Sequence, residues 1–270
     1  MLTFLFWNTN RKPIAGLVAR LVEEHQVDVL ALAEMGISGV EILLRLNAGS
    51  PDFHYAPSRL PTAVEVFTRF SPDFLTPMFE SGRISIRRMT LPARPELLLA
   101  MMHLPSKLHW SEDSQALGFP ELARELRQEE ERAGHARTLL IGDLNVDPFE
   151  PGMVSASGLH GMMTRQLASR GSRTVQGRVY PTFYNPMWGH FGDRSGGPSG
   201  TYYYERAEQV VHFWHIFDQV LIRPDLLQFC PSDPVTIITQ AGDTPLRMES
   251  GRPDQSIGSD HFPLLFKLSL

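Results

Sequence analysis

Residues 2–8 read LTFLFWN and residues 27–34 read VDVLALAE, and these two segments decide the fold. Each is a short apolar run that ends in a polar residue, which is typical of a buried β-strand followed by a turn. Between them, apolar residues recur at helical spacing after Pro13, a residue that suits the first turn of a helix. A strand, a helix and a strand in this order predict a βαβ unit or a close relative of one.

The rest of the chain adds further apolar segments of strand length. We expect strands at about 63–70, 83–90, 97–102, 138–141, 213–222, 235–239 and 263–268, and helices at 39–47 and 111–132. Residues 180–204 have no clear period and are expected to form a long ordered loop. The mixture of βα units with antiparallel strands predicts an α/β (α+β) fold of packed sheets with helices outside. Because no stretch resembles a linker, we expect one domain over residues 1–270, with an extended aromatic and glycine-rich loop at about 180–212.

The composition bounds the class of protein. The chain has 270 residues, of which 42% are hydrophobic and 20% charged, so it carries enough apolar material for a sizeable core. The single cysteine, Cys230, excludes an intramolecular disulfide and a zinc cluster built from cysteines. The N-terminal segment lacks a basic lead-in, and the longest apolar run is only about six residues. We therefore expect a soluble, cytoplasmic protein without membrane contact.

The charge is unevenly distributed along the chain. The formal net charge is −5, which excludes a globally basic nucleic-acid binder. Residues 159–206 nevertheless hold six arginines against Asp193 and Glu205, a local charge of +4. This segment either meets an anionic ligand or is a solvated loop with scattered arginines, and the sequence leaves both interpretations open.

Polar residues stand at the ends or edges of the predicted buried strands. Taken singly, such residues more often form turns or cap helices. As an ordered set, however, they can be brought together by a rigid scaffold. Carboxylate and amide oxygens without thiols suit Mg²⁺ or Mn²⁺, and a metal with a His–Asp pair suits hydrolysis of a phosphate ester. The set consists of Asn8, Glu34, His103, Asp143, Asn145, Asp218, Asp260 and His261.

Six motifs in order carry a resemblance to a known family. They read FWNTN (6–10), LALAEM (30–35), MHLPSK (102–107), LLIGDLNVDP (139–148), FDQVLI (217–222) and GSDHFPLLF (258–266). With these motifs the chain resembles the endonuclease/exonuclease/phosphatase superfamily of deoxyribonuclease-like enzymes. The resemblance implies a four-layer sandwich, in which two packed mixed β-sheets are flanked by helices.

The resemblance also implies a metal site. Glu34 corresponds to the main carboxylate ligand of a catalytic Mg²⁺ or Mn²⁺, and Asn8, close beside it, is expected to belong to the metal site. Asp260 is either a supporting carboxylate or a ligand of a second metal. Many nucleases of the family carry an aspartate where this chain has Asn10, which favours one metal over two.

The remaining residues receive roles at the phosphate. By resemblance, Asp143 positions or deprotonates the attacking water and Asn145 donates a hydrogen bond to a phosphate oxygen. His261 contacts the phosphate, and Asp218 accepts from its other ring nitrogen and fixes its tautomer. A neutral His261 would activate water and a charged one would donate to the phosphate, and both states stay open. His103 corresponds to a histidine that contacts the phosphate or assists the leaving group.

The aromatic loop adds a feature that compact members lack. Its aromatic side chains either stack on bases or sugars or pack a small core beneath the loop. These residues are Tyr184, Trp188, Tyr202, Tyr203 and Tyr204.

Three functions remain. The leading one is a metal-dependent phosphoesterase, a nuclease that acts on DNA or RNA by metal-assisted attack of water. The first alternative is a phosphatase or phosphodiesterase of a small-molecule or lipid phosphate, for which Arg11, Lys12, Lys107 or the arginine-bearing loop would supply positive charge. The absence of an apparent apolar hairpin disfavours a lipid. The second alternative is a catalytically inactive binding module. DNA versus RNA, endo versus exo action and the oligomeric state stay open.

Overall fold

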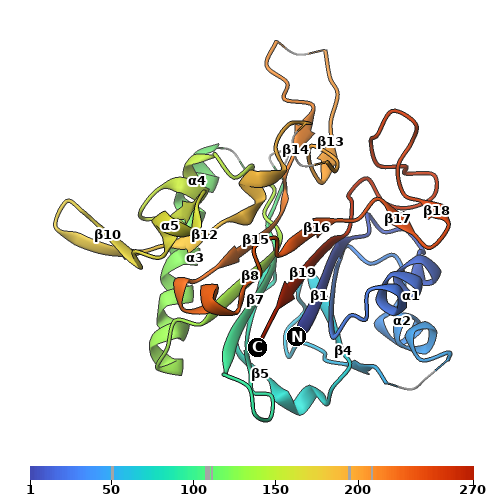
Figure 1. Cartoon of the computed structure of the whole chain (residues 1–270), viewed down its shortest axis with the longest axis horizontal. Helices are drawn as coiled ribbons and strands as arrows, with labels where there is room; N and C mark the ends of the chain where they lie inside the picture. The colour runs from blue at the N-terminus through green and yellow to red at the C-terminus, as the bar shows by residue number, and fades with distance from the viewer. Residues whose placement is uncertain (50–51, 107–109, 111, 194–195, 208) are drawn as a thin grey trace.

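The computed structural model describes residues 1–49, 52–106, 110, 112–193, 196–207 and 209–270. Two β-sheets pack face to face, with helices on both outer sides (Figure 1). On one side lie α1 (Ala15–Glu24) and α2 (Gly39–Leu46), and on the other lie α3 (Glu112–Ala133) and the short α4 (Pro151–Val154). This arrangement confirms the α/β four-layer sandwich.

The first sheet joins the two ends of the chain. β1 runs parallel to β2, which confirms the βαβ prediction, and antiparallel to β19 near the C-terminus. The strand order is β16-β19-β1-β2-β4-β3. The strands are β1 (Leu2–Asn8), β2 (Val29–Ala33), β3 (His54–Tyr55), β4 (Val64–Thr68), β16 (Val235–Ile237) and β19 (Leu264–Leu268).

The second sheet is built around a parallel pair. β7 runs parallel to β8, and β15 pairs antiparallel with the other side of β8. The strand order is β5-β6-β7-β8-β15-β12-β9. The strands are β5 (Leu75–Glu80), β6 (Ile84–Met89), β7 (Leu97–His103), β8 (Thr138–Asp143), β9 (Gly161–Met162), β12 (Phe183–Tyr184) and β15 (Asp218–Ile222).

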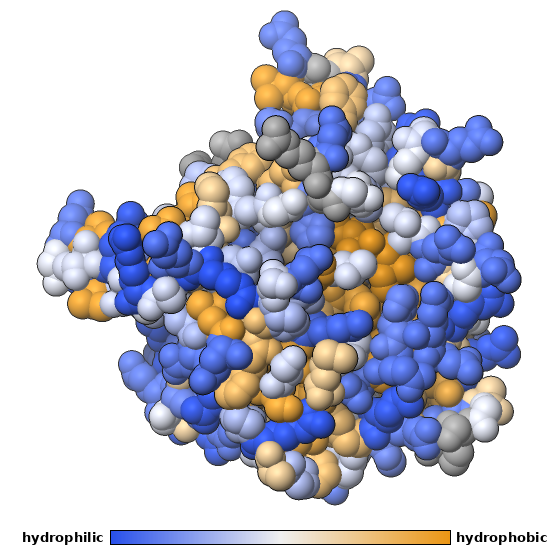
Figure 2. Space-filling model, in the orientation of Figure 1, coloured by the Kyte–Doolittle hydropathy of each residue, from blue (hydrophilic) through white to orange (hydrophobic). Residues whose placement is uncertain are grey.

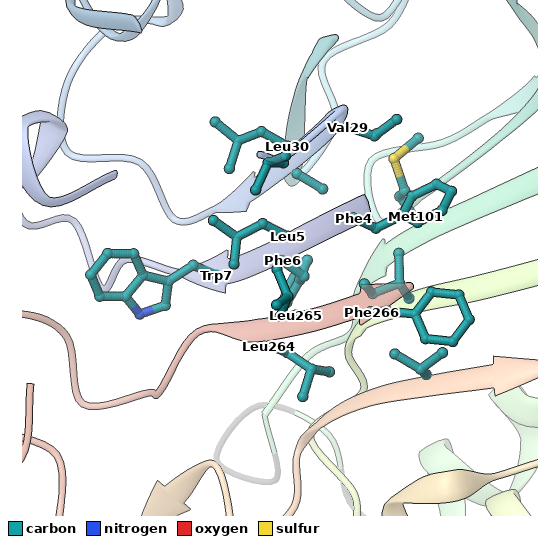
Figure 3. Packing of buried hydrophobic residues seen from close by; sticks show 14 of the residues in the cluster. Phe4, Leu5, Phe6, Trp7, Val29, Leu30, Met101, Leu264, Leu265 and Phe266 are labelled. Atoms are coloured by element: carbon teal, nitrogen blue, oxygen red, sulfur yellow. The ribbon is translucent and has the colours of Figure 1, made fainter. Parts of the chain in front are cut away.

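The core has two compartments, because the second sheet is covered on both faces. Leu99 and Met101 of β7 face the space between the sheets, whereas Leu98 and Met102 face α3. Figure 3 places Met101 in the inter-sheet cluster with side chains from β1 and β19. Double coverage explains why the central strands are continuously apolar rather than alternating. Burial of each large apolar side chain contributes about 1.5–3 kcal/mol.

Two predictions about the second half of the chain were wrong. Residues 213–222 are not one strand, because β14 (Trp214–His215) and β15 are separate and β14 pairs with β13 (Tyr202–Tyr203). Strand pairing between β15 and β8 begins at Asp218. The residues before Asp218 therefore form their strand hydrogen bonds with a different segment, which is β13. Residues 180–204 are not a single loop, since they contain β12, β13 and η2 (Pro186–His190). Two-residue strands are too short to show a period.

The expected strands also miss several real ones. β5 was not expected, because Pro77 interrupts its pattern, but an edge strand tolerates proline. The hairpin of β10 (Ser172–Val175) and β11 (Arg178–Pro181) was not expected either, and it projects from the body of the molecule (Figure 1). Short elements complete the chain: η1 (Pro72–Phe74), α5 (Arg165–Ala168), η4 (Pro224–Phe229), β17 (Gln240–Ala241) and β18 (Thr244–Pro245). Among the described residues, no helix combines the length and apolar character needed to cross a bilayer.

Candidate active site

Strand ends from both sheets meet at one edge of the sandwich. Asn8 ends β1, Glu34 follows β2, and His103 and Asp143 end the parallel strands β7 and β8. Asp218 begins β15 directly opposite Asp143 in the antiparallel register. Parallel pairing within each sheet therefore brings carboxyl ends together, and the antiparallel β15 adds its amino end.

A cleft of about 450 Å³ opens at this edge. The candidates Glu34, Asp143, Asp260 and His261 line it, whereas Asp218 is buried behind His261. The full lining is Asn8, Glu34, Ser106, Asp143, Asn145, Tyr202, Tyr204, Arg206, His215, Phe217, Asp260 and His261. Residues that are far apart in the chain thus share one cleft.

Glu34 is held in an unusual backbone conformation. Its φ of 47° lies in the left-handed region, which a glutamate rarely adopts. Its carbonyl oxygen accepts from Thr9 Oγ1 at 2.8 Å and from the Arg11 backbone N–H at 2.7 Å. These bonds from the turn after β1 stabilise the strained residue, and 31% of its side chain is exposed to the cleft.

Asn8 links two of the carboxylates. Its Nδ2 donates to Asp143 Oδ2 at 2.9 Å and lies 3.3 Å from Glu34 Oε1. Its Oδ1 accepts from the Asn10 backbone N–H at 3.0 Å, which fixes the orientation of the amide. In this orientation Asn8 positions the carboxylates, because its oxygen is already engaged.

Asp143 and Asn145 form a local unit after β8. The Asn145 backbone N–H donates to Asp143 Oδ1 at 2.9 Å, and Asn145 itself has a left-handed φ of 52°. The Asn145 side chain donates one N–H to the Leu104 carbonyl at 2.8 Å. The second N–H of this amide is the one it can offer to a substrate.

His261 is fixed from several sides. Its Nδ1 lies 2.7 Å from Oδ2 of the fully buried Asp218. Its backbone N–H donates to Ser259 Oγ, and its carbonyl accepts from Trp7 Nε1 at 2.8 Å. Because the carboxylate occupies Nδ1, the Nε2 atom is the ring nitrogen that remains for a substrate.

His103, at the end of β7, lies close to carboxylates from both sheets. Its Nε2 lies 3.4 Å from Glu34 Oε1 and 3.6 Å from Asp143 Oδ2. The imidazole is thus adjacent to both carboxylates, although it is not part of the cleft lining.

Electrostatics make His261 cationic. Burial by itself would lower the pKa of His261, but the charge and hydrogen bond of Asp218, with Asp143 and Asp260 nearby, raise it to about 10. Burial raises the pKa of Asp143, and the positive charge of His261 opposes this rise. A charged His261 favours donation to a phosphate oxygen over activation of water by the same ring.

The donor set fits a hard divalent cation. Ligand atoms of Asp143, Asp218 and His261 lie within 4.8 Å of one another, but a cationic His261 paired with Asp218 has no lone pair for a metal, so the carboxylates are the donors. Among the described residues, Oδ1 of the buried Asp218 has no hydrogen-bond partner. With Glu34 and Asp260 in the same cleft, the carboxylates outnumber the nearby histidines, and a divalent cation would balance this charge.

Sequence reasoning missed a second His–Asp pair. His215 Nδ1 lies 2.7 Å from Oδ2 of the buried Asp147, whose Oδ1 accepts from the Ile216 backbone N–H. The His215 ring stacks on Phe217 at a centroid distance of 4.7 Å and lines the cleft. The two residues are 68 positions apart, so no local pattern could have paired them.

The aromatic residues of the expected loop divide between both interpretations. Tyr202 and Tyr204 line the cleft, and the Tyr202 ring lies 4.8 Å from that of His261. Tyr184 instead packs against the inter-sheet core, and Trp188 contacts Phe191. Tyr203 packs edge-on against Trp214. Tyr202 and Tyr204 are therefore available for stacking, whereas Tyr184 and Trp188 are structural.

The cationic residues considered for a phosphomonoester are unevenly placed. Arg11 Nε lies 4.0 Å from Glu34 Oε2, with 84% of the Arg11 side chain exposed. Arg206 lines the cleft, with its guanidinium 5.2 Å from the Tyr204 ring. Lys107 and Arg194 lie outside the described residues.

Comparison with known protein families assigns the chain to one of them. Residues 5–261 match the Endonuclease/Exonuclease/phosphatase family, so the chain belongs to that family. This match confirms the resemblance drawn from the six motifs. No curated protein matches the sequence.

Solved structures share the fold at low identity. An endonuclease/exonuclease/phosphatase family protein from Leptotrichia buccalis C-1013-b has 15% identity and a TM-score of 0.56, with 100% of each chain covered. The endonuclease domain of TRAS1, a telomere-specific non-LTR retrotransposon, has 12% identity and a TM-score of 0.56, covering 100% of this chain and 99% of that one. The 3′ phosphatase NExo from Neisseria, bound to product DNA hairpin, has 16% identity and a TM-score of 0.55 over 100% of each chain.

Proposed function

We propose that this protein is a divalent-metal-dependent phosphoesterase that hydrolyses phosphodiester bonds in nucleic acid. The observation that carries this proposal is the convergence of Glu34, Asp143 and His261, from three distant parts of the chain, in one cleft. Carboxylates beside a cationic, Asp-oriented imidazole suit an anionic substrate whose charge must be neutralised during attack.

The metal in this proposal is Mg²⁺ or Mn²⁺. Glu34 and Asp260 would hold it, with Asn8 keeping Glu34 and Asp143 in place through its amide. When bound, the metal supplies neutralisation of charge on a non-bridging phosphate oxygen. Asn10 offers no carboxylate, which favours a single metal.

The chain's own residues supply the remaining chemistry. Asp143 orients the attacking water and accepts its proton, and the second N–H of Asn145 donates to a phosphate oxygen. His261 donates to a phosphate oxygen through Nε2, while Asp218 holds the proton on Nδ1 and fixes the ring. His103, adjacent to Glu34 and Asp143, contacts the phosphate or the leaving oxygen.

Nucleic acid is the substrate class that the cleft favours. Tyr202, Tyr204 and Phe217 present aromatic faces beside the phosphate site, and stacking of a base on such a face is worth about 1–3 kcal/mol. Among proteins of this fold, one structure is an endonuclease domain and another is a 3′ phosphatase bound to DNA. The single-domain organisation and the cytoplasmic location expected from the sequence stay predictions.

A second candidate is hydrolysis of a phosphomonoester at the same site. It is favoured by Arg206 and His215, which add cationic or donor groups to the cleft and suit the extra negative charge of a monoester. This candidate uses the same metal and the same Asp143 and His261.

One panel separates these functions. The purified protein is incubated with plasmid, linear single-stranded DNA, RNA, bis-p-nitrophenyl phosphate and p-nitrophenyl phosphate, each with Mg²⁺, Mn²⁺ or EDTA. Cleaved strands with metal, and none with EDTA, support the nuclease. Release from the monoester alone supports the phosphatase. No product from any substrate supports an inactive binding module and contradicts the proposal.

A further inference from the structure

The segment between Glu150 and Asp193 has an unusual charge. It contains four arginines and no aspartate or glutamate, in a chain whose formal net charge is −5. The candidate active site uses none of these arginines. The four are Arg165, Arg170, Arg173 and Arg178.

Part of this segment forms the projecting hairpin of β10 and β11. Figure 1 shows it extending away from the body of the molecule, and Figure 2 shows the same projection with strongly hydrophilic side chains beside a few hydrophobic ones. The turn residues Gln176 and Gly177 both have positive φ, 50° and 77°. A two-residue turn of this kind matches the twist of the strands and makes a defined ribbon rather than a loose loop.

The strand register places the charges on one face of the ribbon. Arg173 pairs with Tyr180, and Val175 pairs with Arg178. Because cross-strand partners and alternate residues share a face, these four side chains lie on the same side of the hairpin. That face therefore combines two guanidinium groups with one aromatic ring.

Three of these arginines make no side-chain hydrogen bond or ion pair in the described part of the chain. Arg170, Arg173 and Arg178 are exposed, and no acidic group lies within ion-pair distance of them among the described residues. Arg165 is different, because its guanidinium donates to the carbonyls of Leu227 and Pro231. The hairpin thus keeps a row of uncompensated positive charge in solvent, although the rest of the chain is acidic.

We propose that the cationic face of the β10–β11 hairpin binds the phosphate backbone of a nucleic acid whose scissile phosphate lies in the cleft. This inference rests on the proposed function and adds to it a second contact outside the cleft. Guanidinium groups pair with phosphates through charge-assisted hydrogen bonds, and Tyr180 provides a face for a base or sugar. A substrate must extend beyond the cleft to reach the hairpin, so the contact discriminates long nucleic acids from small esters.

The test begins with binding, separated from cleavage. In an Asp143→Asn background, the double variant Arg173→Glu/Arg178→Glu is compared with the control Arg59→Glu/Arg83→Glu, which makes the same charge change at two other exposed arginines. Anisotropy measures the affinity for a fluorescent duplex of about 30 base pairs. This duplex is longer than the roughly 16 base pairs that a compact double-stranded-RNA-binding domain spans, so it can extend beyond the cleft. We expect the hairpin variant to bind at least about tenfold more weakly and the control variant to change much less. The plot of log affinity against log salt should become shallower by about 0.9 for each phosphate that the hairpin no longer neutralises.

Kinetics with active Asp143 provide the second readout. For the hairpin variant, KM for the long duplex should rise in parallel with the loss of affinity, while kcat/KM for bis-p-nitrophenyl phosphate stays unchanged. If kcat/KM for bis-p-nitrophenyl phosphate falls as much as that for the long duplex, the substitutions have damaged the fold and the proposal is overturned. Equal loss in the hairpin and control variants would also overturn it, because net charge alone would then explain the result.

Two further outcomes separate the hairpin from the proposed function. If the wild-type protein cleaves nucleic acid and the hairpin variant behaves like the control, the hairpin inference fails and the function stands. If the wild-type protein hydrolyses only small esters and the Asp143→Asn variant binds no nucleic acid, the proposed function fails. If the hairpin is needed for binding to phosphatidylserine vesicles and the protein binds no nucleic acid, the partner is a membrane and the inference is wrong.

Discussion

Nδ1 of His261 lies 2.7 Å from Oδ2 of Asp218, although 43 residues separate them in the chain. The pairing depends on β15, which sets Asp218 opposite Asp143, and on the turn before β19, which carries His261. Asp218 thus orients the imidazole of His261, while its cross-strand partner Asp143 lines the cleft. The relationship makes the role of each residue separately testable.

Asp218→Asn should lower kcat by roughly 10²–10⁴-fold, the range of general acid–base and orienting effects. An amide lacks the negative charge that keeps His261 protonated, so the neutral ring would no longer donate from Nε2 as an imidazolium. The measurement is kcat on bis-p-nitrophenyl phosphate, with NMR of the His261 ring to report the tautomer. If NMR shows a changed His261 ring but kcat is unchanged, Asp218 has no role in the mechanism.

Asp143→Asn and His261→Ala should both abolish hydrolysis but differ in stability. Burial disfavours the charged form of Asp143, so the neutral amide should leave the thermal midpoint nearly intact. Removal of His261 leaves the buried Asp218 carboxylate without its partner, which costs about 3–5 kcal/mol. Activity assays and calorimetry check both, and equal stability of the two variants would argue against the buried pair.

Mg²⁺ should raise the thermal midpoint of the wild-type protein and EDTA should abolish activity. A cation that binds only the folded state stabilises it by about 2.7 kcal/mol at a hundredfold excess over Kd. Glu34→Gln should remove most of this thermal shift, because it removes the main proposed ligand. A full Mg²⁺ shift in that variant would place the metal elsewhere.

His215→Phe should lower kcat/KM by about tenfold, a cost typical of removing one hydrogen bond to a substrate. It should also lower the thermal midpoint, because it leaves Oδ2 of the buried Asp147 without its partner. Phenylalanine keeps the stack on Phe217 but removes Nε2 from the cleft. Comparison of mono- and diester substrates would identify which group Nε2 contacts. Wild-type kinetics on every substrate would make the His215–Asp147 pair a structural contact only.

Stability should fall as the pH drops below neutrality, in part through His160. Burial lowers the pKa of His160 below 6.5, with further lowering from Arg173 and Arg223 partly opposed by the hydrogen bond to the Pro181 carbonyl. As the pH falls through 6.5, His160 takes up a proton in the unfolded chain but not in the folded protein. The contribution of His160 to stability is therefore complete above pH 6.5 and is lost as the pH falls below it.

His160→Asn provides the check, because asparagine tolerates the left-handed φ of 52° at this position. Urea unfolding of this variant between about pH 7 and 5, which spans the ordinary pKa of histidine, should show a smaller loss of stability than the wild type. The exposed His54→Asn serves as the control and should keep the wild-type slope.

Much of the candidate site could be predicted because each residue follows an apolar strand. Asn8, Glu34 and Asp143 stand where a buried run ends, and strand ends are where polar groups can converge. His215 and Asp147 could not be paired in this way. His215 lies in a two-residue strand whose cross-strand neighbour, Tyr202, comes from a segment without a period.

The sequence by itself determined the βαβ start, the buried central strands and the identity of the oxygen and imidazole donors, because apolar periodicity and residue chemistry are local properties. Only the tertiary structure decided that Asp218 faces Asp143, that Asn8 links Glu34 to Asp143, and that the arginines of β10 and β11 share an exposed face. These relationships depend on strand register and sheet packing between distant segments. Their free energy comes from burial of the whole core, which no single stretch of sequence encodes.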